Sequence, residues 1–158
     1  MDRTRSSGVC REIVLVEDFQ PDAELIRKAL AETGVLNSIR WFTNGMAALT
    51  YLREAEETAA IGPGVPAILL LDIKLPGVTG FDILEYVQYR PAFARTLRIV
   101  LSQIEDLMSI KRGYALGAHS FLTKPLKGAD VRELIRTFPG YWSIDGKAAK
   151  ARPINVAL

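Results

Sequence analysis

The sequence has little cysteine or histidine and lacks a long apolar run. Its 158 residues include one cysteine, Cys10, and one histidine, His119. One cysteine excludes a disulfide within the chain and fits a reducing compartment. The longest apolar run, residues 67–71, is far below the ~20 residues that cross a membrane. Residues 1–10 lack the apolar centre of a signal peptide. We therefore expect a cytoplasmic protein with no membrane partner.

The net charge of +2 is unevenly distributed. Three arginines against two acids give residues 1–12 a charge of +1, and three basic residues against one aspartate give residues 145–158 a charge of +2. Residues 13–144 are left with −1. A nucleic-acid-binding domain concentrates its basic residues on one face or helix. Because the basic excess lies at the two ends, we expect no nucleic-acid partner.

Five short apolar segments alternate with five amphipathic stretches. The expected strands are residues 13–16, 39–43, 67–71, 97–101 and 120–123. Each is followed by helix-like periodicity, and residues 55–66, rich in glycine and proline, are expected to form a loop. Strands that alternate with helices need parallel crossover connections. The sequence therefore predicts an α/β fold, a three-layer sandwich whose five-stranded parallel sheet is covered on both faces.

Polar residues follow four of the expected strands. Glu17 and Asp18 follow the first, Asp72 the third, Ser102 the fourth and Lys124 the fifth. In open parallel sheets, ligands bind at the carboxyl ends of the strands. Three carboxylates in one place repel one another, and their oxygens suit a hard cation such as Mg²⁺. Since a carboxylate can attack phosphorus while a metal, a lysine and a hydroxyl stabilise the transferred group, the set indicates phosphoryl transfer onto an aspartate.

These segments resemble the receiver domain of two-component response regulators. The likeness lies in VEDFQPDAELI, LLLDIKLPGVTGFDIL, IVLSQ and SFLTKPL, in this order, and runs from about residue 11 to 138. It implies the flavodoxin-like (βα)5 fold with strand order 2-1-3-4-5. We expect an N-terminal tail over 1–10, a receiver domain over 11–138 and a C-terminal extension over 139–158, with no separate output domain.

The resemblance implies a role for each acidic residue. Asp72 matches the phosphoacceptor. Asp18 matches the direct Mg²⁺ ligand, Glu17 binds mostly through water, and Asp72 and the backbone carbonyl of Lys74 complete the protein ligands.

Further residues match the positions that stabilise and read the phosphoryl group. Lys124 pairs with that group in the family, and the peptide bond from Lys124 to Pro125 is usually cis. Ser102 supplies the hydroxyl that moves toward the phosphoryl oxygens, and Phe121 occupies the aromatic switch position.

Two residues depart from the family pattern. Gln103 follows Ser102 where the family usually has a small residue, and Lys74 places a cation two positions after Asp72. We expect both to tune the rates at which Asp72 gains and loses a phosphoryl group.

The resulting prediction is a single-domain response regulator that accepts a phosphoryl group from a sensor histidine kinase and signals by protein contact. It would catalyse its own phosphorylation and dephosphorylation without turning over a separate substrate. EDFQPDAELIRKAL, the loop before residue 67 and the Tyr141-Trp142 pair resemble stand-alone regulators paired with phytochrome-type kinases. The last helix with Tyr141 and Trp142 would form a homodimer interface, or these aromatics fold back onto their own domain.

Two other functions are compatible with the fold. A degenerate receiver would act as an unphosphorylated scaffold, and Gln103, which could crowd Asp72, keeps that alternative open. A flavin-binding module would need a phosphate-cradling loop after the first strand, where Glu17 and Asp18 would repel phosphate.

Overall fold

The computed structural model of the chain describes residues 11–62, 64–103 and 106–145. The expected N-terminal tail, with Cys10, and residues 146–158 of the C-terminal extension lie outside the described residues.

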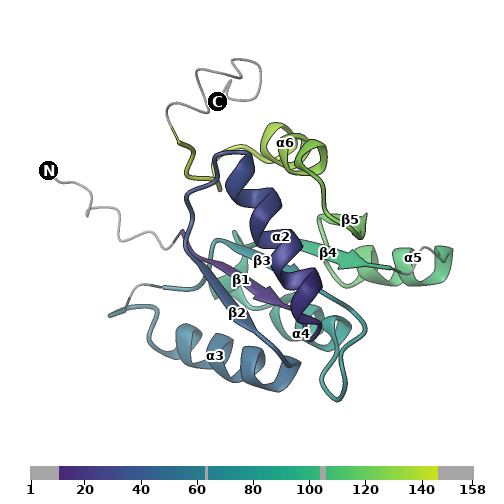
Figure 1. The fold of residues 1–158 in the computed structure, drawn as a ribbon. Coiled ribbons are helices and arrows are strands. Elements are labelled where there is room, and N and C mark those ends of the chain that lie inside the picture. Colours follow the sequence, from purple (N-terminus) through teal and green to yellow (C-terminus); the bar gives the residue numbers. More distant parts are fainter. Residues whose placement is uncertain (1–10, 63, 104–105, 146–158) are drawn as a thin grey trace, which may run out of the picture.

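Five parallel strands form the central layer (Figure 1). They are β1 (Ile13–Val16), β2 (Ile39–Phe42), β3 (Ile68–Leu71), β4 (Leu97–Ser102) and β5 (Ser120–Thr123). Their order across the sheet is β2-β1-β3-β4-β5, which confirms the predicted fold and strand order. The residues of β1, β3 and β4 are all buried, as expected for inner strands of a sheet that is covered on both faces.

Helices cover both faces of this sheet (Figure 1). One face carries α2 (Gln20–Glu32) and α6 (Gly128–Thr137), and the other carries α3 (Gly45–Glu57), α4 (Gly80–Val87) and α5 (Leu107–Ala115). Alternate residues of each inner strand face opposite layers. In β1, Ile13 and Leu15 belong to the core under α2 and α6, whereas Val14 and Val16 belong to the core under α3 and α4.

The strands keep their predicted positions to within one residue, but one helix is longer than predicted and one short element is additional. The loop expected from residue 55 begins later, because α3 continues to Glu57. Alanine and glutamate favour helix, so they extend α3 until Thr58 caps it. A short 3-10 turn, Pro91–Phe93, was not predicted and buries Phe93 before β4 begins.

The described part of the C-terminal extension packs against its own domain. Trp142 is 6% exposed within the core under α2 and α6, and its indole N–H donates to the Phe138 carbonyl at 3.0 Å. Ile144 forms an antiparallel bridge with Val35. Of the two alternatives considered for the aromatic pair, the structure shows the fold-back, and Trp142 is not available to a dimer interface in this arrangement.

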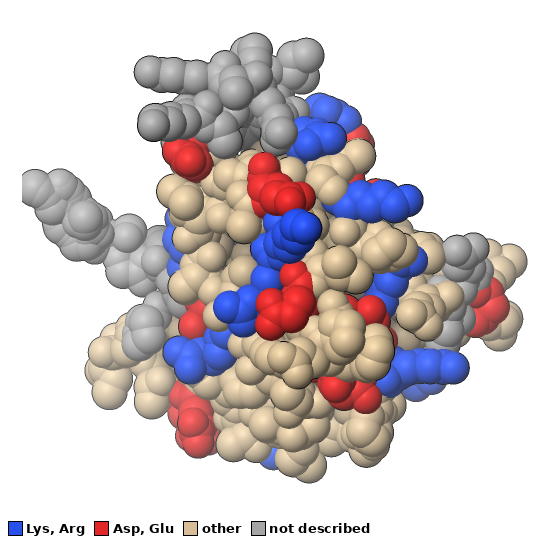
Figure 2. Space-filling model, viewed as in Figure 1, with Lys and Arg blue, Asp and Glu red and all other residues tan. Residues whose placement is uncertain are grey.

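Charged side chains of both signs are interspersed on the face shown in Figure 2. Lys28 and Glu32 of α2, for example, form an exposed ion pair at 3.9 Å. Among the helices that the structure describes, none combines the length and apolar character needed to cross a membrane.

Candidate functional site

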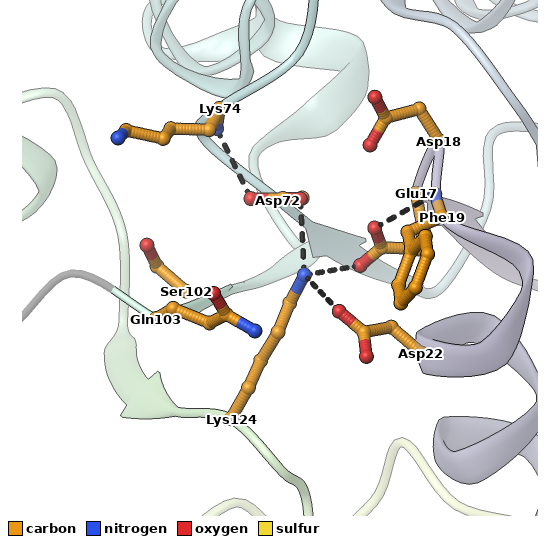
Figure 3. Close-up of a pocket in the computed structure, with 9 residues that line it drawn as sticks. All are labelled: Glu17, Asp18, Phe19, Asp22, Asp72, Lys74, Ser102, Gln103 and Lys124. Carbon is orange, nitrogen blue, oxygen red and sulfur yellow. Dashed lines mark hydrogen bonds and ion pairs between the residues drawn. The ribbon is translucent and has the colours of Figure 1, made fainter.

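A pocket of about 270 Å³ opens at the carboxyl ends of the strands (Figure 3). It brings together all seven residues that the sequence placed at the phosphorylation and metal site or beside it, and it adds two more, Phe19 and Asp22. The complete lining is Glu17, Asp18, Phe19, Asp22, Asp72, Lys74, Ser102, Gln103 and Lys124.

Backbone hydrogen bonds fix these residues by continuing the sheet beyond the strand ends. The amide of Glu17 donates to Phe42 at 3.0 Å, and the amide of Asp72 donates to Val16 at 3.0 Å. On the far side of the pocket, the amide of Lys124 donates to the Ser102 carbonyl at 2.9 Å. The side chains therefore start from rigid backbone, although they are far apart in the sequence.

The ammonium group of Lys124 lies among three carboxylates. Its Nζ is 3.0 Å from Asp72 Oδ2, 3.1 Å from Asp22 Oδ2 and 2.5 Å from Glu17 Oε1 (Figure 3). The Lys124 side chain is only 6% exposed, so these contacts are shielded from solvent. The peptide bond from Lys124 to Pro125 is cis.

Burial and charge shift the pKa values of this cluster. Burial raises the pKa of Glu17 to about 7; Lys124 opposes the rise, and the nearby charge of Asp72 adds to it. Burial lowers the pKa of Lys124, but its Glu17 and Asp72 partners outweigh that effect and leave it above its ordinary value. The lysine is therefore a fixed positive charge at neutral pH.

Glu17, Asp18 and Asp72 fit a divalent cation. One carboxylate oxygen from each lies within 4.8 Å of the others. Glu17 Oε1 is buried and, apart from its ion pair with Lys124, has no hydrogen-bond partner of suitable geometry among the described residues. An all-oxygen donor set of this kind suits Mg²⁺.

The two departures from the family pattern lie on opposite sides of Asp72. The backbone amide of Lys74 donates to Asp72 Oδ1 at 3.0 Å, while its ammonium points away from Lys124 (Figure 3). Gln103 is exposed, and its side chain runs toward Lys124. Both residues line the pocket that holds Asp72.

The expected switch residues differ in burial. Ser102 is 1% exposed at the end of β4 and lines the pocket. Phe121 is half-buried and does not line it. Its ring packs against α5, where a Cβ atom at Gly113 would lie 3.0 Å from Phe121 Cδ2. The absence of a side chain at Gly113 is what allows the ring to lie this close.

Three residues beside the site were not identified from the sequence. Asp22 stands in the first turn of α2, where acids are common whatever their contacts. Phe19 is a half-exposed neighbour of the acidic pair. Trp41 lies in β2, and its indole N–H donates to the Glu17 carbonyl at 2.8 Å. No local pattern distinguishes these contacts, since they depend on how α2 and β2 are oriented.

Comparison with known proteins agrees with this geometry. Residues 13–136 match the model of the response regulator receiver domain. A probable methanogenesis regulatory protein, FilR2 of Methanothrix harundinacea (strain 6Ac), is 32% identical over 82% of this chain and 82% of its own length.

Two solved structures link the fold to phytochrome signalling proteins. The bacteriophytochrome response regulator AtBRR is 29% identical, with a TM-score of 0.71 over 86% of this chain and 97% of its own. The phosphorylated cyanobacterial phytochrome response regulator RcpA is 28% identical, with a TM-score of 0.67 over 83% of this chain and 96% of its own. The sequence match over most of the fold and the acidic pocket at its carboxyl edge lead to one conclusion: the chain belongs to the response regulator receiver domain family.

Proposed function

We propose that this protein is a response regulator that accepts a phosphoryl group on Asp72 from a sensor histidine kinase. The phosphorylated protein then signals by contact with a partner protein. One observation carries the proposal. The Asp72 carboxylate lies in an open pocket, 3.0 Å from a buried ammonium and grouped with two further carboxylates. A structural aspartate at a strand end would need neither the pocket nor the converging charges.

The chemistry follows from the groups that face the pocket. A carboxylate oxygen of Asp72 attacks the phosphorus of the donor phosphohistidine, the P–N bond breaks, and the imidazole leaves with the electron pair. Lys124 and the Ser102 hydroxyl stabilise charge on the transferred phosphoryl oxygens. Mg²⁺, held by Glu17, Asp18, Asp72 and the backbone carbonyl of Lys74, would supply further neutralisation of that charge. Attack of water on phosphorus breaks the bond between phosphorus and the Asp72 oxygen, releases inorganic phosphate and restores the carboxylate.

The rim of the pocket bears on the lifetime of the phosphorylated state. Lys74 and Gln103 both line the pocket and lie on either side of Asp72 (Figure 3), where an attacking water would pass near them. We propose that these two side chains tune the rate of dephosphorylation.

The proposed donor is a phytochrome-type histidine kinase. Two phytochrome response regulators resemble this chain over more than four-fifths of its length.

The regulator would act in the cytoplasm. Self-association would use the outward face of α6 with half-buried Tyr141, because Trp142 is occupied in the core.

Phosphorylation can be tested without knowing the kinase. The protein is incubated with Mg²⁺ and acetyl phosphate and examined by intact mass, beside Asp72→Asn. We expect one phosphoryl adduct on the parent, removable by hydroxylamine as an acyl phosphate is, and none on the variant. A parent that stays unmodified while a known receiver is labelled would instead support the unphosphorylated scaffold.

The kinase assignment needs a second comparison. Phosphorylated phytochrome-type and unrelated histidine kinases are each mixed with the protein, and the initial rates of phosphotransfer are measured. Faster transfer from the phytochrome-type kinase supports the assignment. Equal or slower transfer contradicts the phytochrome link but leaves phosphorylation of Asp72 standing.

A further inference from the structure

We infer that Asp22 is a positioning residue, which holds the ammonium of Lys124 at the phosphorylation site from the side of α2. The inference rests on the proposed function, because it assigns a role in the phosphorylation of Asp72. Asp22 was not among the residues that the family resemblance assigned to the site.

The contact itself is well defined. Asp22 Oδ2 accepts a hydrogen bond from Lys124 Nζ at 3.1 Å, and the two side chains are 17% and 6% exposed. An ammonium has three N–H donors, and three carboxylates surround this one. Asp22 is therefore one of the three carboxylates that share the ammonium of Lys124.

The three carboxylates do not have equivalent roles in the reaction. Phosphorylation converts the Asp72 carboxylate into an acyl phosphate, so the negative charge at this position moves onto the phosphoryl oxygens. Glu17 belongs to the oxygen cluster that fits a cation. Asp22 belongs neither to the reacting group nor to that cluster, so it can hold Lys124 both before and after transfer.

Asp22 also lies on a rigid support. It stands in the first turn of α2, and the following residues Ala23 and Ile26 are buried against the sheet. Lys124 has a long flexible side chain that loses substantial rotamer freedom when held in one place. A carboxylate on a packed helix fixes the ammonium before the phosphoryl donor arrives, which is how preorganised charge stabilises a transition state.

A purely structural explanation has to be separated from this one. An acid in the first turn also stabilises the helix through its dipole. That effect would lower thermal stability when Asp22 is replaced, but it requires no contact with Lys124. Glu24 provides a matched control, because it is an exposed acid on the same helix.

The first measurement addresses the contact in unphosphorylated, metal-free protein. The ¹H–¹⁵N signal of the Lys124 ammonium is recorded by NMR and assigned by its loss in Lys124→Met. We expect Asp22→Asn to shift this signal and speed its exchange with water, whereas Glu24→Gln leaves it unchanged. An unaltered signal in Asp22→Asn would overturn the inference, whether or not Asp72 is phosphorylated.

The second measurement addresses the rate of phosphorylation by acetyl phosphate at saturating Mg²⁺. We expect about a tenfold loss in Asp22→Ala and about a threefold loss in Asp22→Asn, because a charged acceptor forms a hydrogen bond roughly twice as strong as a neutral one. Glu24→Gln should match the parent. Thermal unfolding of each variant, recorded in parallel, shows that the proteins compared are folded.

The outcomes separate the two proposals. Parent-like rates in both Asp22 variants would overturn the positioning role while the proposed function stands. A parent protein that does not become phosphorylated removes the proposed function, and the inferred role in phosphorylation falls with it. The ammonium signal would then still show whether Asp22 holds Lys124.

Discussion

Gly80, the first residue of α4, lies directly against the backbone of Asp72. A Cβ atom at Gly80 would stand 2.5 Å from the Asp72 carbonyl oxygen and 2.9 Å from the Cα of Ile73. The helix α4 thus packs onto the loop after β3 through a residue without a side chain. The neighbouring atoms belong to the backbone and cannot rotate away as a side chain can.

We expect Gly80→Ala to lower the free energy of unfolding by about 2–3 kcal/mol, the upper part of the range for overpacking, and to slow phosphorylation of Asp72. Gly113→Ala is the comparison. There the nearest atom belongs to the Phe121 ring, which can rotate, and the gain in helix propensity of about 1 kcal/mol offsets the contact. Urea denaturation measures both effects. Equal losses in the two variants would contradict the distinction between backbone and side-chain neighbours.

Replacing Lys124 with methionine should leave three carboxylates without their shared cation. Because the side chain is 6% exposed, we expect the free energy of unfolding in EDTA to fall by about 3 kcal/mol. Added Mg²⁺ should restore more stability in this variant than in the parent, since a cation that binds the folded state stabilises it. Lys74→Met removes an exposed lysine from the same rim and should cost little. A comparable loss in both variants would show that the cluster does not depend on Lys124.

Tryptophan fluorescence should report on the acidic pocket through one of the two indoles. Trp41 donates to the Glu17 carbonyl, whereas Trp142 lies in the core under α2 and α6. In Trp142→Phe, we expect Mg²⁺ to change the emission in a saturable titration. In Trp41→Phe, the remaining emission should not respond. If Mg²⁺ changed the emission only in Trp41→Phe, the ion would bind away from the acidic pocket.

The only histidine of the sequence provides a pH test away from the acidic pocket. His119 Nδ1 accepts the Arg98 amide N–H at 3.0 Å. Partial burial of the ring, followed by the charge of Arg98, lowers its pKa below 6.5. Between the lowered pKa of the folded protein and the ordinary value of 6.5, the unfolded chain therefore binds more protons than the folded one. The stability that neutral His119 contributes is thus fully present above pH 6.5 and is lost as the pH falls through the folded-state pKa.

NMR titration of the His119 ring protons measures this shift directly. We expect a midpoint below 6.5 in the folded protein and near 6.5 in urea. In His119→Gln, the stability lost between pH 6.5 and 5 should be smaller than in the parent. A midpoint above 6.5 in the folded protein would contradict the predicted direction.

Strand ends made much of the site predictable. Asp72 and Lys124 are far apart in the sequence, but each follows an apolar segment, and the carboxyl ends of parallel strands share one edge. Their proximity therefore follows from the α/β pattern. The receiver resemblance then supplied roles that spacing alone does not contain.

Contacts made by helices and by the C-terminal extension were less predictable. Whether Asp22 faces Lys124 depends on the rotation of α2 about its axis, which is set by the packing of Ala23 and Ile26. Trp142 follows the last helix, where no periodic element constrains its direction. The sequence allowed this side chain to lie either at an interface or in the core, because an apolar residue is equally favourable in both places.

The side chain of Asn37 joins segments near the first and the last of the described residues. Its amide nitrogen donates to the carbonyls of Arg11 at 2.6 Å and Tyr141 at 3.0 Å, at the end of the sheet opposite the pocket. A short linker between residues 145 and 11 could therefore close the body into a ring. New ends opened within residues 59–62, in the loop before β3, would leave each pocket residue on an unbroken element. Circular permutation thus offers a way to attach a reporter without disturbing the pocket that holds Asp72.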